Sequence, residues 1–366
     1  MARLIKQLRL GCSPGVDGVM ADHLRYGLGT TLALHISVML TLCLQFGCVP
    51  DPFRSGNLIP ILKKPHLDPT TAAHYRPITV SITFSKLLEL YMLSECSDHD
   101  ADANQYGFVA HRGTATAIAL AHDVCVYCQS EGSQTYLCSL DAEGAFDALP
   151  HPIIFLKAAN VMPDHCWRLM YSWYSNMHVR IKWGTCISDP IPVNRDTRQG
   201  GLTSPFLFNL FYEDLIAELN LMSCGISIDD HHYNVHCYAD DILLSSATVS
   251  GLQRLIDCAV GYITSHGLRF NPAKSSCFSY GKGASATECY IEGQAIPQVE
   301  EMVYLGATLR NDSGTAHAER RSNSATKAFY SLQGVGLRLH GLSPDVCAKL
   351  FTTGVRTVLS YAIVCL

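Results

Sequence analysis

The chain has 366 residues, of which 48% are hydrophobic and 16% are charged. This composition excludes an intrinsically disordered protein and provides enough apolar material for one large domain or several packed subdomains. The net charge of −5 gives no overall signature of a nucleic-acid-binding protein, although seven basic and three acidic residues lie between residue 309 and the end. A basic end of this kind either follows a phosphate backbone or forms an ordinary solvated helical face.

The sixteen cysteines are scattered through apolar runs, and the first residues show no secretory signal. We therefore expect reduced thiols in the cytoplasm or nucleus, and no membrane association. Cys125 and Cys128 have the spacing of a zinc-binding pair, but no second pair lies near them, which disfavours zinc. Residues 28–48 are apolar but carry several polar side chains, and they predict a buried helix rather than a membrane span.

The first part of the chain predicts short elements separated by proline and glycine turns. A turn and a helix start occupy residues 11–24, and a strand-like region with several prolines occupies residues 49–80. Helices are expected around residues 85–93 and 115–128. A strand over residues 135–140 then ends at an acidic residue.

The remaining elements alternate between strands and helices without a regular strand–helix–strand rhythm. Helices are expected near residues 153–173, 204–220 and 252–266, and again in the basic end. Strands are expected at residues 178–183, 186–193, 233–238 and 241–246, with a hairpin over residues 289–309. This order favours an α+β fold with an antiparallel sheet over a doubly wound parallel sheet.

Two adjacent carboxylates, Asp240 and Asp241, interrupt apolar strands on both sides. Neighbouring side chains of a strand point to opposite faces, so both can serve one site only if the chain turns tightly at residues 239–241. Such a pair repels unless a proton or a cation neutralises it. The alternative is a solvated turn, which is the interpretation we give to Asp229–Asp230 in its polar surroundings.

A third carboxylate, Asp141, ends the strand over residues 135–140. If that strand lies beside the hairpin, Asp141 and Asp240 could hold two metal ions between them. Two such ions activate an attacking oxygen and stabilise a leaving oxygen in an in-line displacement at phosphorus. Carboxylate and phosphate oxygens suit Mg²⁺, with Mn²⁺ as a substitute, rather than zinc.

Three segments around these carboxylates resemble signature blocks of reverse transcriptases of non-LTR (LINE-type) retrotransposons: "YADD" at 238–241, "SLDAEGAFDALPH" at 139–151 and "RQGGLTSPFLFNLFYEDL" at 198–215. Five further segments are similar to other blocks of that family and occur in its order: "SPGVDGVMADHL", "GNLIPILKK" with "HYRPITVSITFSKLLE", "NQYGFVAHRGTATAI", "GLRFNPAKSS" and "MVYLGATL". The chain departs from the family at Leu202 and Thr203, where Pro and Leu are common, and at Val109, where Arg is frequent.

The resemblance implies a right-hand polymerase with fingers, palm and thumb, and RNA-directed DNA synthesis from dNTPs on a primer 3′-OH. The expected divisions are an N-terminal extension and fingers over 1–134, and a palm over 135–308 with a fingers-side insertion at about 155–197. A truncated thumb is expected over 309–366. RNA template, DNA primer and dNTPs are the implied partners, and an endonuclease module encoded elsewhere in the element is a candidate further partner.

The resemblance also assigns residues. It implies that Asp141 and Asp240 bind metal with Asp241 as a less direct third member, and that Lys274 protonates the leaving pyrophosphate. Phe146 matches the steric gate that would strike a ribose 2′-OH, with core packing as the alternative. The substrate-binding positions are Lys63, Arg76, Gln199 and Gly200, and the nucleic-acid-binding positions are Arg112, Tyr304, Leu305 and Gly306.

Three hypotheses follow. The first is an active RNA-directed DNA polymerase that uses two Mg²⁺ ions. The second is a catalytically silent descendant that binds nucleic acid or serves as a scaffold, although all three carboxylates are present. The third is the polymerase of a self-splicing intron, which the "SPGVDG" opening disfavours.

Overall fold

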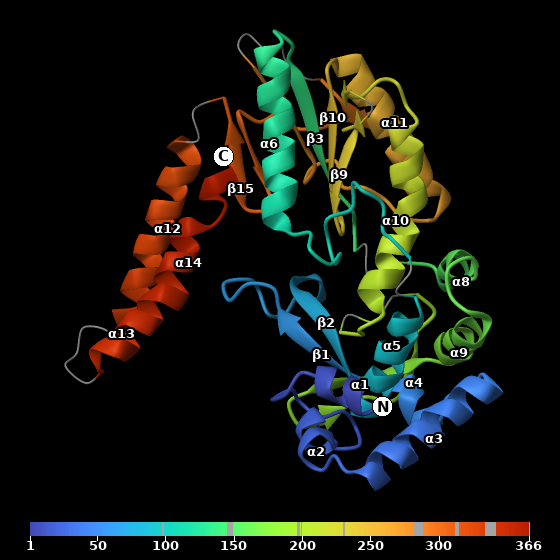
Figure 1. Cartoon of the computed structure of the whole chain (residues 1–366). Helices are drawn as coiled ribbons and strands as arrows, with labels where there is room; N and C mark the ends of the chain where they lie inside the picture. The colour runs from blue at the N-terminus through green and yellow to red at the C-terminus, as the bar shows by residue number, and fades with distance from the viewer. Residues whose placement is uncertain are drawn as a thin grey trace. The chain divides into compact units, whose positions relative to one another are not determined.

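The computed structural model describes residues 1–96, 99–144, 149–195, 198, 200–229, 231–281, 288–311, 315–333 and 342–365. The chain divides into two compact units, and Figure 1 labels their elements. Unit 1 comprises Met1–Ala101, Gly144–Asp214 and His266–Leu268, and unit 2 comprises Asp102–Glu143, Leu215–Ser265 and Arg269–Leu366. Each unit combines helices with a sheet, so the predicted α+β class is confirmed.

Unit 1 contains a five-stranded sheet in the order β2-β1-β4-β5, with β6 also paired to β4. Its strands are β1 (Ser55–Leu62), β2 (Tyr75–Ser81), β4 (His178–Trp183), β5 (Cys186–Ile187) and β6 (Ile191–Pro192). β1 pairs with β2 in antiparallel and with β4 in parallel orientation. The strand-like region that the sequence predicts over residues 49–80 therefore supplies two of these strands.

Eight helical segments lie wholly in unit 1 within its described residues: α1 (Ala2–Gln7), α2 (Ala21–Tyr26), α3 (Thr30–Phe46), α4 (Asp51–Arg54), η1 (Ala72–His74), α5 (Thr83–Glu95), α8 (His151–Ala158) and α9 (Asp164–Tyr174). The helical stretch expected near residues 153–173 thus consists of two helices. Pro163 is the N-cap of α9 and has an extended conformation (φ −57°, ψ 144°). A proline imposes this break because it lacks an N–H and disfavours helical geometry in the residue before it.

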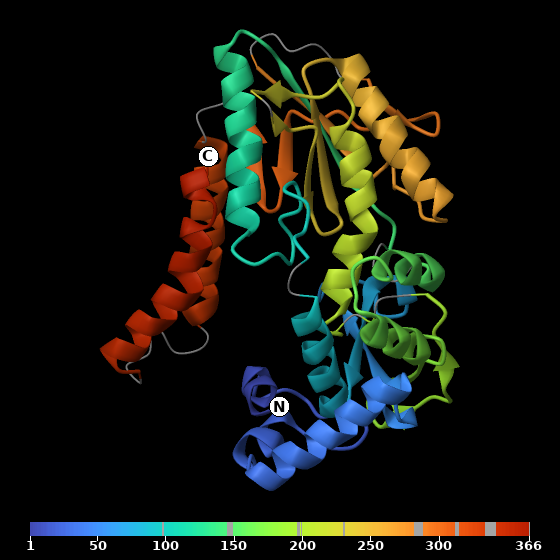
Figure 2. The ribbon, with the colours of Figure 1, turned by 45° about the vertical axis from the view of Figure 1, so that its right-hand side comes forward.

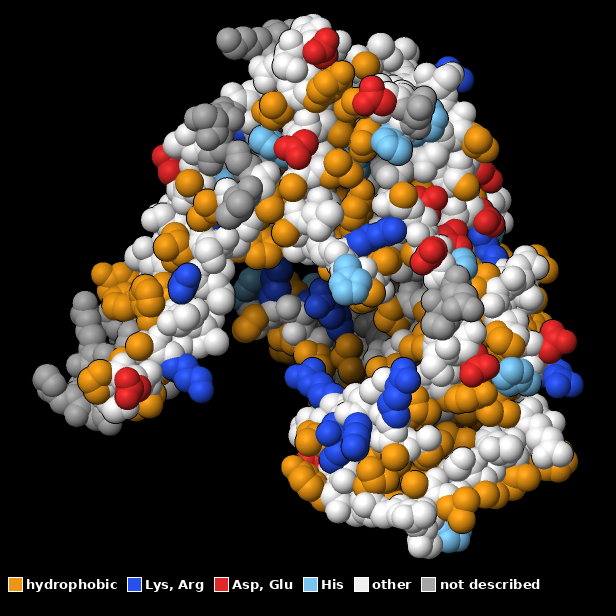
Figure 3. Space-filling view, viewed as in Figure 1, with side chains coloured by type: hydrophobic (Ala, Val, Ile, Leu, Met, Phe, Trp, Pro, Cys, Tyr) orange, Lys and Arg blue, Asp and Glu red, His pale blue; other side chains and the backbone are white. Residues whose placement is uncertain are grey.

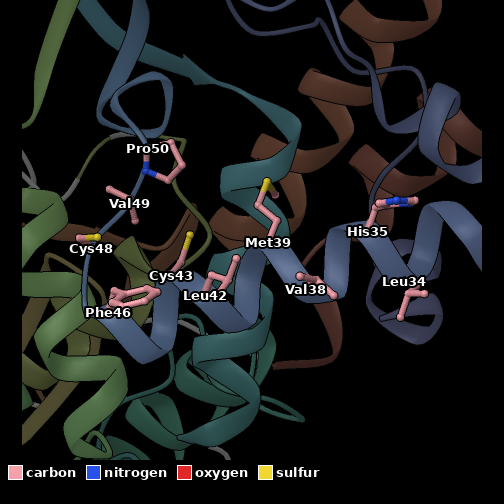
Figure 4. Close-up of a pocket in the computed structure, with 10 residues that line it drawn as sticks. All are labelled: Leu34, His35, Val38, Met39, Leu42, Cys43, Phe46, Cys48, Val49 and Pro50. Carbon is pink, nitrogen blue, oxygen red and sulfur yellow. The ribbon is translucent and has the colours of Figure 1, made fainter.

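Helix α3 corrects the prediction that residues 28–48 form a buried helix. Ile36, Leu40 and Cys43 are buried, but the opposite face exposes large apolar side chains. These are Leu34 at 60%, Val38 at 50%, Leu42 at 46% and Phe46 at 70% exposure. They line an apolar groove of about 640 Å³ (Figure 4). Figure 3 shows hydrophobic side chains along this part of the surface. The exposed polar side chains of Thr31, His35, Thr41 and Gln45 are interspersed with these apolar ones, so the sequence did not show that a stripe of large apolar side chains faces water.

Unit 2 is centred on a four-stranded antiparallel sheet in the order β11-β3-β10-β9. Its strands are β3 (Thr135–Asp141), β9 (Val235–Tyr238), β10 (Asp241–Ser246) and β11 (Ser276–Tyr280). Helix α6 (Thr114–Ser130) covers one face and helix α11 (Val249–Ser265) the other (Figures 1 and 2). Leu137, Leu243 and Phe278 pack with α6, as expected for alternating residues on paired strands.

The hairpin expected over residues 289–309 is two hairpins, β12–β13 and β14–β15. The remaining elements of unit 2 are β7 (Ser227–Ile228), β8 (His231–His232), β12 (Tyr290–Ile291), β13 (Gln294–Ala295), β14 (Glu301–Tyr304), β15 (Ala307–Arg310), α12 (Thr315–Gln333), α13 (Pro344–Leu350), η2 (Phe351–Arg356), α14 (Thr357–Ser360) and η3 (Ile363–Cys365). Helix α10 (Ser204–Asn220) contributes residues to both units. Across the described part of the chain, no helix combines the length and apolar character needed to cross a bilayer.

Candidate active site

The adjacent carboxylates lie at a two-residue hairpin between β9 and β10. Tyr238 pairs with Asp241, so Ala239 and Asp240 form the turn, as the sequence predicts. Ala239 has φ 56°, and Asp240 has a negative φ. A positive φ at the first turn residue alone is the pattern of a type II′ turn, which matches the twist of the flanking strands. We call Tyr238–Asp241 the catalytic hairpin, after the role that the sequence predicts for its carboxylates.

The third carboxylate reaches the same place. Asp141 is the last residue of β3 and pairs directly with Asp241 across the antiparallel ladder. Residues paired in this way share a face, and their Cβ atoms lie about 4.5–5.5 Å apart. Burial, followed by the charges of Asp240 and Asp141, raises the pKa of Asp241 to about 6. Three carboxylates from distant parts of the sequence therefore act on one another, as the sequence predicts.

The donor set fits a hard divalent cation. The three groups are carboxylates, which Mg²⁺ and Mn²⁺ prefer, and their mutual repulsion is what a cation would relieve. Within the described residues, no three His, Cys, Asp or Glu side chains enclose a metal position by themselves. Magnesium usually keeps waters and substrate phosphates among its ligands, so a site with few protein ligands is compatible with it.

Lys274 is held beside Asp141. Its Nζ lies 3.7 Å from Asp141 Oδ2. The turn that carries it is tied to the end of β3, because Asn271 N donates to Asp141 O (2.8 Å) and Asp141 N donates to Ser275 Oγ (3.2 Å). The structure thus brings the predicted proton donor to the carboxylates.

A second tight hairpin, formed by β14 and β15, carries Tyr304, Leu305 and Gly306. Tyr304 pairs with Ala307, and both turn residues have positive φ, 48° at Leu305 and 78° at Gly306. Tyr304 Oη donates to His236 O on β9 (3.3 Å). Burial raises the pKa of Tyr304 well above its ordinary value, and the nearby Asp241 charge acts in the same direction. This hairpin is therefore anchored on the strand that leads into the catalytic hairpin.

From the other side, the β14–β15 turn is held by the C-terminal helices. Arg321 donates to Gly306 O and stacks on the Tyr361 ring at 4.6 Å. Tyr361 Oη donates to Leu305 O (2.7 Å). The contacts that would orient this hairpin thus come from α12 and from the segment after α14.

The predicted substrate-binding residues that the structure describes lie in unit 1. Arg76 shares a face of the sheet with Ile78, since both are on β2 two residues apart. Gly200 packs on the same strand, where an added Cβ would lie 2.7 Å from Thr79 O. Lys63 Nζ instead donates to Ala73 O (2.9 Å). Phe146 and Gln199 lie outside the described residues, so their assignments stay predictions.

A buried ion pair that the sequence did not suggest fixes the turn after Arg198. Glu89 is fully buried and accepts from Arg198 Nη2, from Leu202 N (3.1 Å) and from Thr203 Oγ1 (3.3 Å). Arg198 has φ 51° and stacks on Trp173 at 4.5 Å. Glu89 and Arg198 are 109 residues apart, and no periodicity links them. The departure from the family at Thr203 thus supplies one of the hydrogen bonds.

The Arg112 side chain donates hydrogen bonds from Nη1 to backbone carbonyl oxygens of the segment before α6. It donates to Ala103 O (3.3 Å), to Asp102 O and to Gln105 O (2.8 Å), and so supports the segment before α6. Its expected contact with template backbone stays a prediction.

Comparison with known proteins gives the family. The family model described as "Reverse transcriptase (RNA-dependent DNA polymerase)" matches residues 61–309. The type-2 retrotransposable element R2DM Pol polyprotein of Drosophila melanogaster is 26% identical over 342 residues, which cover 89% of this chain and 31% of that protein. The RNA-directed DNA polymerase from mobile element jockey of the same organism is 24% identical over 319 residues, covering 84% of this chain and 34% of that protein. The chain therefore spans about a third of these relatives' length.

A solved structure supports the fold. The chain is similar to apo telomerase from Candida tropicalis truncated from its C-terminal domain, with a TM-score of 0.51 and 11% identity. The similarity covers 76% of this chain and 59% of that one. The prediction of a right-hand polymerase fold is thereby confirmed, while the expected division into fingers, palm and thumb at stated residues stays a prediction. The chain belongs to the reverse transcriptase (RNA-dependent DNA polymerase) family, and its curated relatives are polymerases of non-LTR retrotransposons.

Proposed function

We propose that this chain is the polymerase part of a retrotransposon protein and performs RNA-directed DNA synthesis with two Mg²⁺ ions. The observation that carries the proposal is the cross-strand pairing of Asp141 with Asp241 beside Asp240. Members of the family generally use divalent metal ions. When bound, two such ions would neutralise charge at the attacking 3′-hydroxyl and at the leaving pyrophosphate.

The chain's own residues would bind and orient the reactants. Asp141 and Asp240 would hold the metal ions, with Asp241 beside them. Lys274, 3.7 Å from Asp141 Oδ2, would donate a proton to the leaving pyrophosphate. The β14–β15 hairpin would hold the primer end, and Arg76, Lys63 and Gly200 would contact the dNTP.

The remaining assignments follow the family. Phe146 would exclude ribonucleotides and Gln199 would line the dNTP pocket, with Arg112 on the template. RNA template and DNA primer are the proposed partners, together with an endonuclease module elsewhere in the element. All sixteen cysteines are free thiols, which supports a reducing intracellular setting in cytoplasm and nucleus.

Primer extension on an RNA template tests the proposal. Asp240→Asn should lower dNTP incorporation by at least about 10³-fold, because losing a metal ligand removes several kcal/mol of transition-state stabilisation at ~1.4 kcal/mol per decade. Asp229→Asn is the matched control, since Asp229 is an exposed turn residue with φ 52°, a conformation that Asn tolerates. Folded wild-type chain that incorporates no dNTP, or an Asp240→Asn variant with full activity, would contradict the proposal.

A further inference from the structure

We propose that Gln105 is a positioning residue that fixes the backbone of the catalytic hairpin, an inference that rests on the proposed function. Gln105 lies in the segment between the start of unit 2 and α6, and its side chain is fully buried. Its side-chain oxygen contacts the backbone of the turn that carries Asp240, so it acts on the carboxylates through that turn.

The backbone of this segment extends the central sheet. Tyr106 N donates to Cys237 O (2.8 Å), and Cys237 N donates to Asn104 O (2.9 Å). Gln105 and Cys237 form a parallel bridge. The segment therefore follows β9 up to the residue before the catalytic hairpin, which places the Gln105 side chain at the turn.

The Gln105 side chain holds the turn by its oxygen. Oε1 accepts from Ala239 N (3.1 Å) and from Gly107 N (2.9 Å). Two N–H donors can be satisfied only by the oxygen, so the amide orientation is fixed by its partners. Nε2 is buried without a hydrogen-bond partner among the described residues. A buried unpaired donor costs about 1–3 kcal/mol, which the fold tolerates at the side chain that fixes this turn.

The turn needs such support. Ala239 has φ 56°, which costs a non-glycine residue about 1–2 kcal/mol. The hydrogen bond to its N–H opposes relaxation to an ordinary conformation. Gly107 closes on the hairpin from the same side, since an added Cβ would lie 2.4 Å from Ala239 N and 2.9 Å from Tyr238 C. Arg112 in turn holds Gln105 O (2.8 Å).

A neutral amide suits this position chemically. A cationic side chain beside Ala239 would compete with metal for Asp240, and an anionic one would add to the repulsion among the three carboxylates. Since a displacement of about 1 Å in a catalytic group can cost ~10²-fold in rate, loosening the turn should lower turnover while leaving primer–template binding intact.

The variant Gln105→Met keeps the side-chain volume and removes the acceptor. It should lower kcat for dNTP incorporation about 10- to 100-fold, with the KM for primer–template unchanged within about twofold. Asn234→Leu is the matched control. Asn234 is also a fully buried amide with two backbone hydrogen bonds, to Leu219 O and Met222 O (both 2.8 Å), but it lies just before the other end of β9.

A measurement independent of activity accompanies the kinetics. Amide hydrogen exchange at Ala239 should accelerate in Gln105→Met and in Gly107→Ala but stay at the wild-type rate in Asn234→Leu. Wild-type exchange at Ala239 in Gln105→Met would overturn the inference, as would an equal loss of kcat in Asn234→Leu. An inactive wild-type chain would overturn the proposed function instead, and the exchange rates would still decide the role of Gln105.

Discussion

Two turns that carry predicted functional residues are held in chemically opposite ways. In unit 1, the turn that begins at Arg198 is fixed by the buried Glu89–Arg198 ion pair, which also engages Leu202 N. In unit 2, the catalytic hairpin is fixed by the neutral amide of Gln105 and by the close approach of Gly107. Both turns start with a non-glycine residue at positive φ, so both need external support.

The difference follows from the charge that each turn presents. The catalytic hairpin already concentrates three carboxylates, and a charged support would either repel them or occupy them. The described residues of the Arg198 turn carry no such cluster, and a charged pair can be buried there because each partner satisfies the other. In this chain, a neutral side chain supports the turn that carries carboxylates, and a charged pair supports the turn that does not.

Removing the Glu89–Arg198 ion pair should have the largest effect on the stability of the folded chain. Arg198→Met leaves the Glu89 carboxylate buried and unpaired, which should lower the free energy of unfolding by about 3–5 kcal/mol. The double variant Glu89→Gln/Arg198→Met should recover most of this, because glutamine still accepts from Leu202 N without a buried charge. Urea denaturation of the three proteins measures both values, and a loss below about 1 kcal/mol in Arg198→Met would show that the pair is not the main support.

The second effect is a loss of folding stability at acid pH, which arises in the sheet that carries the catalytic hairpin. His236 on β9 is fully buried, and burial lowers its pKa to about 4. Because burial depresses the pKa of His236, the folded chain favours its neutral form. The contribution of this histidine to folding stability is therefore complete above the ordinary histidine pKa of about 6.5 and is lost as pH falls towards 4. The shift corresponds to about 3 kcal/mol between pH 7 and pH 4.

The variant His236→Leu isolates this contribution. Its free energy of unfolding should fall about 3 kcal/mol less than that of the wild-type chain between pH 7 and pH 4. Equal pH dependence in the two proteins would show that His236 is not the acid-sensitive group.

The smallest effect concerns the hairpin itself. Ala239→Gly relieves the positive φ of this non-glycine residue but increases the freedom of the unfolded chain, so stability should rise by at most about 1 kcal/mol. If Gln105 fixes the turn, kcat should stay within about twofold of wild type in this variant and fall clearly only when Gln105→Met is added. Thermal unfolding and single-turnover incorporation measure the two quantities. A large fall in kcat for Ala239→Gly alone would mean that Ala239, rather than its support, sets the geometry.

The sequence predicted local features well where one pattern determines them. Apolar strands flanking Asp240 and Asp241 required a tight turn, which the register confirms. Asp141 at a strand end indicated a site at the sheet edge; the register pairs Asp141 with Asp241, and the role of these carboxylates stays a prediction. The division of residues 153–173 between two helices could have been anticipated from Pro163, which interrupts an otherwise helical pattern.

Two features that depend on distant partners were not predicted. Glu89 lies within a helix among apolar residues, and nothing local shows that its partner is Arg198. Gln105 lies in the segment "NQYGFVAHRGTATAI", which is similar to a block of the family. Its proposed role nevertheless depends on a bridge to Cys237, 132 positions further along the chain. Pairings of this kind are set by the assembled sheet and leave no periodic trace in the sequence.

The exposed stripe on α3 has a practical consequence for these experiments. Leu34, Val38, Leu42 and Phe46 present a continuous apolar surface to water. Surfaces of this kind promote reversible self-association, and association makes apparent melting temperature and specific activity depend on protein concentration through mass action. Variants are therefore comparable only at a single, matched concentration, and a dilution series of the wild-type chain defines the range in which differences in turnover report on the catalytic hairpin alone.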